Sequence, residues 1–168
     1  YLRKWAIEAP EMTFLAQRDD AGDWHRFSYR QVFTAAQSIS EALLTRGLGF
    51  EQPLMVLSGN SLNFARIMLG AMLVGIPVVP ISPAYSLVSR GFEKLKHIYA
   101  SIRPGLIYVE DIKPFEAALS ALDLEGIEIV ATKSADAKIR ATSFTELLAY
   151  TITTKVQAAV EKVGPDTI

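Results

Sequence analysis

Short runs of apolar residues alternate with longer helical segments from Pro53 onward, and this alternation constrains the fold more than any other feature. Strands are expected at Leu54–Leu57, Ile76–Ile81, Leu106–Val109 and Ile127–Val130, each of four to six residues. None of these runs alternates apolar with polar positions, as a strand with one solvated face would. The intervening segments are long enough for helical crossovers between parallel strands. The sequence therefore predicts an α/β fold, with a mostly parallel sheet flanked by helices on both faces.

The helices between and after these strands are predicted from their apolar spacing. Residues Leu62–Val74 are apolar almost all round, which is typical of a buried helix. Gly70 and Gly75 are expected to let that helix lie close to the sheet. Two further helices are expected at Lys113–Leu122 and Thr154–Val163. The segment 87–102 is predicted as one helix with an inner face formed by Leu87, Phe92, Leu95, Ile98, Tyr99 and Ile102.

The N-terminal region predicts a short helix followed by a β-hairpin. Helical spacing covers Tyr1–Glu8 and stops before Pro10. Two strand-like segments, Met12–Arg18 and Asp23–Ser28, flank a loop that contains Gly22. Such a pair of segments around a short glycine-containing loop is typical of a hairpin.

Two capping boxes indicate where helices begin. The motifs Ser28–Gln31 and Ser143–Glu146 have the Ser-x-x-Gln/Glu spacing in which two side chains satisfy free amides reciprocally. Gly47 is expected to end the first of these helices in a left-handed conformation. Residues 131–142 have no periodicity and are predicted to form a surface loop.

Composition excludes several classes of protein. The 168 residues suit one domain, expected over 1–168, and the 17 basic and 18 acidic side chains give no overall field that draws the chain to nucleic acid. Zero cysteines rule out disulfides and thiolate metal sites, and two histidines make a His-rich zinc site unexpected. No apolar run reaches the roughly 20 residues of a membrane span. These features fit a cytoplasmic protein with no nucleic-acid or membrane partner.

Two groups of residues are candidates for anion sites. The turn Ser58–Ser61 lies between a strand and a helix N-terminus, where free amides can receive an anion; the favoured interpretation is that Asn60 or Ser61 caps the helix. Arg90, Lys94 and His97 share a predicted helix face that phosphates can approach; the favoured interpretation is a solvated surface.

An acidic pair was considered as a metal site. Glu110 and Asp111 follow a strand end, where two carboxylates can hold a cation, but Asp111 as a helix cap is the more economical interpretation. His25, beside Trp24 in the hairpin, is expected to be a surface or a packed residue rather than a ligand. The sequence also lacks the glycine-rich dinucleotide and triphosphate motifs and the Gly-x-Ser-x-Gly elbow of hydrolases. No catalytic, cofactor-binding or metal-binding residue is therefore assigned.

A series of short stretches spread over nearly all of the chain carries a family resemblance. They are Trp5-Ala6, Pro10-Glu11, Trp24–Tyr29, the turn Ser58–Ser61, Leu69–Ile81, Lys96–Ile98 and Pro104–Val109. In this order they resemble stretches of the adenylate-forming enzymes, a superfamily of acyl-CoA synthetases, luciferases and peptide-synthetase adenylation domains. Within this superfamily, Ser82–Leu87 is most similar to feruloyl-CoA synthetases.

The resemblance implies that the chain is the N-terminal subdomain of a larger carboxylate–CoA ligase, ending ahead of the phosphate loop and the mobile C-terminal domain. It implies ATP, Mg²⁺, CoA and an aromatic, feruloyl-type carboxylic acid as ligands of the parent enzyme. The phosphate loop Thr-Ser-Gly-Ser-Thr-Gly-x-Pro-Lys matches no position here, so none of these ligands is assigned to this chain, which is expected to be an inactive scaffold.

One alternative from a different class stays open at the level of sequence. The chain can be a free-standing, non-catalytic α/β module whose apolar surface docks a partner. A domain separated from a neighbouring subdomain is also expected to expose an apolar patch that allows self-association.

Overall fold

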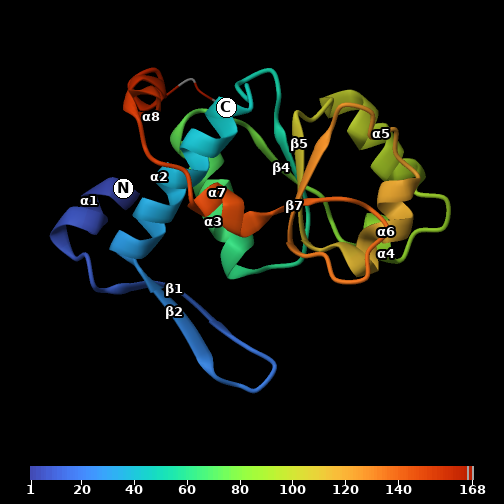
Figure 1. Cartoon of the computed structure of the whole chain (residues 1–168), viewed down its shortest axis with the longest axis horizontal. Coiled ribbons are helices and arrows are strands. Elements are labelled where there is room, and N and C mark those ends of the chain that lie inside the picture. The colour runs from blue at the N-terminus through green and yellow to red at the C-terminus, as the bar shows by residue number, and fades with distance from the viewer. Residues whose placement is uncertain (166, 168) are drawn as a thin grey trace.

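Five parallel strands form the central sheet, in the order β4-β3-β5-β6-β7 (Figure 1). The structure is a computed structural model that describes residues 1–165 and 167. The predicted α/β fold with a parallel sheet is confirmed. The strands are β3 (Leu54–Leu57), β4 (Val78–Pro80), β5 (Leu106–Asp111), β6 (Glu128–Lys133) and β7 (Thr142–Ser143).

Alternate strand residues point to opposite faces of the sheet, and each face is covered by its own set of helices (Figure 1). In β3, Leu54 and Val56 belong to one core, whereas Met55 and Leu57 belong to the other. All four side chains are buried, which explains the continuous apolar run in the sequence. The first face is covered by α2 (Tyr29–Thr45), α3 (Leu62–Leu73), α7 (Phe144–Leu148) and α8 (Thr154–Val160), and the second by α4 (Ala84–Leu87), α5 (Glu93–Ile102) and α6 (Ile112–Ser120).

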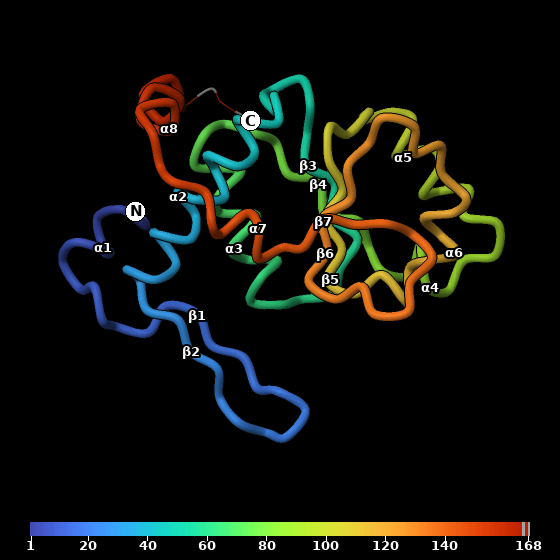
Figure 2. The backbone as a smooth tube through the Cα atoms, viewed as in Figure 1, coloured from blue at the N-terminus to red at the C-terminus, as the bar shows by residue number. Residues whose placement is uncertain are grey.

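The N-terminal helix and hairpin lie outside the sheet, as predicted. Helix α1 (Leu2–Glu8) is followed by the antiparallel strands β1 (Thr13–Arg18) and β2 (Trp24–Ser28). The hairpin loop extends away from the helices of the first face (Figure 2). The Tyr29 ring holds the base of the hairpin to α2, because it stacks on Phe14 with 4.6 Å between ring centroids.

Both predicted capping boxes are present. The Ser28 amide donates to Gln31 Oε1 at 2.8 Å, and the Gln31 amide donates to Ser28 Oγ at 3.3 Å. The second box joins Ser143 and Glu146 at the start of α7 in the same way. Gly47 follows α2 with a φ of 79°, the left-handed conformation predicted for the end of this helix.

The role predicted for Gly70 is wrong in one respect: it brings α3 close to α2 rather than to the sheet. A Cβ atom at Gly70 would lie 2.7 Å from Ile39 Cγ2 and 3.0 Å from the carbonyl oxygen of Ala36. The Ser40 hydroxyl contacts both the Ala36 and the Gly70 carbonyl oxygens at 2.7 Å. The two helices therefore cross with almost no space between their backbones.

The prediction that α3 is buried is only partly right, because most of its residues are partly rather than fully buried. Only Ile67, Gly70 and Ala71 are fully buried in this helix, and the Met72 side chain is 56% exposed. Helix α2 and the sheet cover only part of its circumference. An apolar helix surface therefore remains open on the outer side of the domain.

The segment 87–102 is not one helix. Helix α4 ends at Leu87, and α5 begins only at Glu93, after Gly91 and Phe92 have adopted φ values of 89° and 59°. Left-handed backbone at two consecutive residues interrupts any right-handed helix. As a result Leu87 is 49% exposed instead of facing the core, whereas Phe92 still packs against the second face.

Residues 131–142 are only partly a loop. Strand β6 continues to Lys133, and Thr142 begins β7, which pairs with Val130 and Ala131. A strand of two residues is too short to show any periodicity, which is why the sequence gives no sign of it. Helix α8 likewise ends at Val160, short of the predicted Val163.

Within the described residues, no helix combines the length and apolar character needed to cross a membrane.

Candidate functional site

The strand order places a topological switch point between β3 and β5. The chain leaves β3 through α3 for β4 on one side, and later returns to β5 on the other side of β3. In open α/β sheets, ligands bind at the carboxyl ends of the strands where such a reversal occurs. Two sequence candidates, the turn Ser58–Ser61 and the acidic pair Glu110-Asp111, meet at this point.

Side chains of the protein itself fill the switch point. Ser61 Oγ accepts from the Phe64 amide at 3.0 Å and donates to Glu110 Oε2 at 2.5 Å. The Tyr108 hydroxyl donates to the same carboxylate oxygen at 2.5 Å and lies 2.9 Å from Thr132 Oγ1. Burial and the hydrogen bond to Glu110 both raise the pKa of Tyr108, which therefore stays a neutral donor. This network joins β5, β6 and the start of α3.

The hairpin covers the switch point from the outside, through Gln17 of β1. The Leu62 amide at the start of α3 donates to Gln17 Oε1 at 3.1 Å, and Gln17 Nε2 donates to the Asn60 carbonyl oxygen at 3.3 Å. The amides of Leu62 and Phe64, two of those that would face an anion, are therefore bound internally. The capping interpretation is confirmed, with Ser61 rather than Asn60 as the cap.

The acidic pair is divided between two structural roles. Asp111 caps α6 by accepting from the Lys113 amide at 3.0 Å, as the favoured interpretation predicted. Glu110 accepts the two hydroxyl donors described above. Among residues 1–165 and 167, no three His, Asp or Glu side chains lie close enough to hold a metal ion. The residues at the switch point do not fit a Mg²⁺ or triphosphate site.

The basic residues near α5 are only partly brought together. Lys94 and His97 line a shallow cavity of about 390 Å³ with Tyr85 and Glu93, and the Lys94 ammonium lies 5.2 Å from the Tyr85 ring centroid. Arg90 precedes α5 and is not among the lining residues. Because Glu93 lies among these basic residues, the face is better described as a solvated surface than as a phosphate site.

His25 lies on the exposed part of the hairpin, the first of the two alternatives expected for it. Its Nε2 atom is 2.8 Å from Asp19 Oδ2. This contact and the hydrogen bonds from the Asp23 and Ala21 amides lower the pKa of Asp19. The pair stabilises the turn of the hairpin.

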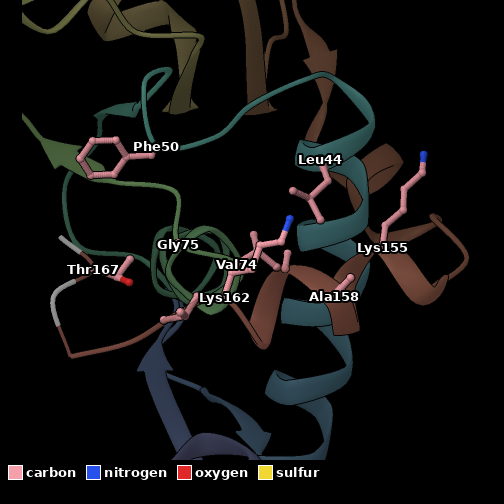
Figure 3. Close-up of a pocket in the computed structure, with 10 residues that line it drawn as sticks. Leu44, Phe50, Val74, Gly75, Lys155, Ala158, Lys162 and Thr167 are labelled. Atoms are coloured by element: carbon pink, nitrogen blue, oxygen red, sulfur yellow. The ribbon is translucent and has the colours of Figure 1, made fainter.

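A larger cavity lies elsewhere, between the end of α2, the end of α3 and α8 (Figure 3). Its volume is about 650 Å³, and most of its wall is apolar, from Leu44, Phe50 and Val74. Lys155 and Lys162 stand at its margin. Sequence analysis did not find this cavity, because its walls come from segments far apart in the chain.

The charge that sequence reasoning passed over is Arg66. It interrupts the apolar run of α3, and its guanidinium lies between the Phe27 and Phe144 rings, 4.7 and 5.6 Å from their centroids. The sequence feature that could have indicated a role for Arg66 is that it is the one charged residue in an otherwise mostly apolar helix.

The doubly wound sheet with an N-terminal hairpin is the fold of several ligases of known structure. A benzoate CoA ligase from Burkholderia xenovorans LB400 is similar with a TM-score of 0.69 and 17% identity, covering 91% of this chain and 28% of that one. A putative long-chain-fatty-acid CoA ligase from Rhodopseudomonas palustris is similar with a TM-score of 0.67 and 19% identity, and the match covers 87% of this chain and 34% of that one. A fatty acid AMP ligase from Legionella pneumophila is similar with a TM-score of 0.65 and 17% identity, and the match covers 90% of this chain and 25% of that one.

The chain belongs to the family of AMP-binding enzymes, whose family model matches residues 2–167. It spans about a quarter to a third of the length of the ligases it resembles. A comparison with curated proteins gave no significant match.

Proposed function

We propose that this chain is the N-terminal α/β subdomain of a carboxylate–CoA ligase. The observation that carries the proposal is the match to the AMP-binding family along residues 2–167. It is supported by the fold shared with fatty acid and benzoate ligases.

The reaction proposed for the parent enzyme has two steps. A carboxylate oxygen of the substrate attacks the α-phosphorus of ATP, and the bond to pyrophosphate breaks, which leaves an acyl-adenylate. The thiolate of CoA then attacks the acyl carbonyl carbon and displaces AMP, so that a thioester forms. Charge that develops on phosphoryl oxygens in the first step is typically stabilised by backbone amides, a lysine and Mg²⁺.

The role proposed for this chain is that of a scaffold. Its switch point is filled by Ser61, Tyr108 and Glu110, and the nearby helix amides are bound by Ser61 and Gln17. The phosphate loop matches none of its positions. A rigid parallel sheet covered on both faces can support a neighbouring subdomain that holds ATP. The open apolar surface of α3, which includes Met72, is one place where such a subdomain can pack.

For the substrate, we propose an aromatic acid of the feruloyl or hydroxycinnamoyl type. The stretch Ser82–Leu87 supports this through its resemblance to feruloyl-CoA synthetases. We further propose a cytoplasmic location, where ATP and CoA are both supplied.

The test is ATP–pyrophosphate isotope exchange by the full-length gene product, with cinnamic, benzoic and fatty acids compared at equal concentration. We expect exchange that depends on the acid and is fastest with hydroxycinnamic acids. The 168-residue chain, assayed in parallel, should release no pyrophosphate. Exchange with fatty acids alone would refute the aryl specificity, and exchange with none of the acids would refute the ligase.

A further inference from the structure

Arg66 is a half-buried cation without an acidic partner among the described residues. Its NH1 atom donates to Asn63 Oδ1 at 3.0 Å, while Nε is buried and has no acceptor. No described carboxylate lies within 4.0 Å of its guanidinium. Burial lowers the pKa of this side chain, although the group stays cationic at neutral pH. The Phe27 and Phe144 rings contact this cation, but they supply no negative charge, and a partly desolvated charge without a counter-ion is costly.

The guanidinium lines a cavity of about 380 Å³ between α2, α3 and the end of β2. Ser38, on α2, lines the same cavity and is only 7% exposed. Thr34 adds a second hydroxyl one helical turn earlier. Gln31 uses Oε1 in the capping box, which leaves its amide NH₂ free to donate.

The walls of the cavity contain hydrogen-bond donors and apolar groups, but no acidic side chain. Arg30 stands at the margin and pairs outward with Glu11 at 3.1 Å. Phe27 and Leu148 provide apolar surface. Positive charge, several hydrogen-bond donors and a partly apolar wall are the features that recognise oxyanions.

We propose that this cavity binds a small oxyanion, either a carboxylate or a phosphate, with Arg66 as its counter-ion and the Ser38 and Thr34 hydroxyls as donors. The site is distinct from the switch point and does not depend on the proposed ligase activity. The apolar wall formed by Phe27 and Leu148 suits a carboxylate on a small apolar body, whereas the donors alone would suit inorganic phosphate.

The test is an NMR titration of the ¹⁵N-labelled 168-residue chain, following the Nε–Hε signals of its arginines. Sodium phosphate and sodium benzoate are added separately, with sodium chloride at matched ionic strength as the blank. We expect a saturable shift of the Arg66 signal with at least one of the two anions. Saturation by benzoate alone identifies a carboxylate site, and saturation by phosphate alone a phosphate site. The absence of a saturable shift with either anion, or an equal shift of the exposed Arg18, would overturn the proposal.

Two substitutions localise the binding. Arg66→Lys keeps the charge but removes the planar fork, and we expect the Kd, followed through backbone amides of the cavity, to rise about tenfold. Ser38→Ala removes one hydroxyl from a helix that tolerates alanine, and the Kd should rise about threefold to tenfold. If Arg66→Lys impairs folding, Ser38→Ala still tests whether the anion binds in this cavity. The matched control is Arg18→Lys, in the hairpin, which should leave the Kd unchanged. Wild-type affinity in both cavity variants would place the anion elsewhere.

Discussion

Replacing Gly70 by alanine tests how closely α2 and α3 pack. The new Cβ would lie 2.7 Å from Ile39 Cγ2 and 2.8 Å from Ile39 Cβ, about 1 Å inside normal carbon–carbon contact. Ile39 is fully buried and cannot move away freely. The helices must therefore separate, which also lengthens the hydrogen bond from Ser40 Oγ to the Gly70 carbonyl oxygen.

Three contributions set the size of the effect. Alanine favours a helix over glycine by about 1 kcal/mol. Overpacking a well-filled core costs about 1–3 kcal/mol, and a weakened buried hydrogen bond costs about 1 kcal/mol. We therefore expect Gly70→Ala to lower the free energy of unfolding by about 1–3 kcal/mol, measured by urea denaturation followed by circular dichroism.

The same chemical change at an open position is the matched control. A Cβ at Gly59 meets nothing within 4 Å, and its φ lies outside the left-handed region. Gly59→Ala should change stability by less than about 0.5 kcal/mol. Adding Ile39→Leu to Gly70→Ala removes the γ2 methyl group and should recover part of the loss. A Gly70→Ala variant as stable as the wild type would show that the helices cross less closely than described.

Three further substitutions test other contacts. Glu128 receives two hydrogen bonds from Arg46, at 2.7 and 3.2 Å; burial raises its pKa, but the bonds from Arg46 and Thr142 together lower it below the ordinary value. Glu128→Gln should therefore cost about 1 kcal/mol at pH 7. This difference should shrink as the pH falls through the lowered pKa of Glu128, because the wild type then loses the charge of its carboxylate. Urea denaturation as a function of pH measures it, and a difference that stays constant would mean that the ion pair contributes nothing. Tyr108→Phe leaves Glu110 with one donor fewer and should lower the free energy of unfolding by about 1–2 kcal/mol, whereas an unchanged value would mean that water replaces the hydroxyl. Ser28→Ala removes half of the capping box and should lower the midpoint of thermal unfolding by an amount equivalent to about 1 kcal/mol; no change would indicate that Gln31 alone is sufficient.

Much of the fold follows from local patterns in the sequence. Ser28 and Ser143 begin helices because their hydroxyls and a Gln or Glu three residues later satisfy free amides within one turn. The four apolar runs became parallel strands because both faces of the sheet must be covered. The family resemblance also rests on short stretches in order along the chain, and the match over residues 2–167 confirms the family.

The errors occurred where a residue depends on neighbours that are distant in sequence. Phe92 takes a left-handed conformation that no periodicity reveals, and so the segment 87–102 is divided. Gly70 was expected to contact the sheet, but its neighbour is Ile39 on α2, 31 positions away along the chain. Ser61 was expected in a turn before a helix and Glu110 after a strand, but the hydrogen bond between them was not expected.

By itself, the sequence determined most of the helices and strands, the mostly parallel sheet, and the family that the chain resembles, because capping, periodicity and motif order are local properties. Only the tertiary structure decided that Gln17, Ser61 and Tyr108 fill the switch point and that Arg66 and Ser38 face one cavity. Those contacts join residues from separate elements, and they exist only once the helices have been placed against the sheet by burial of their apolar faces.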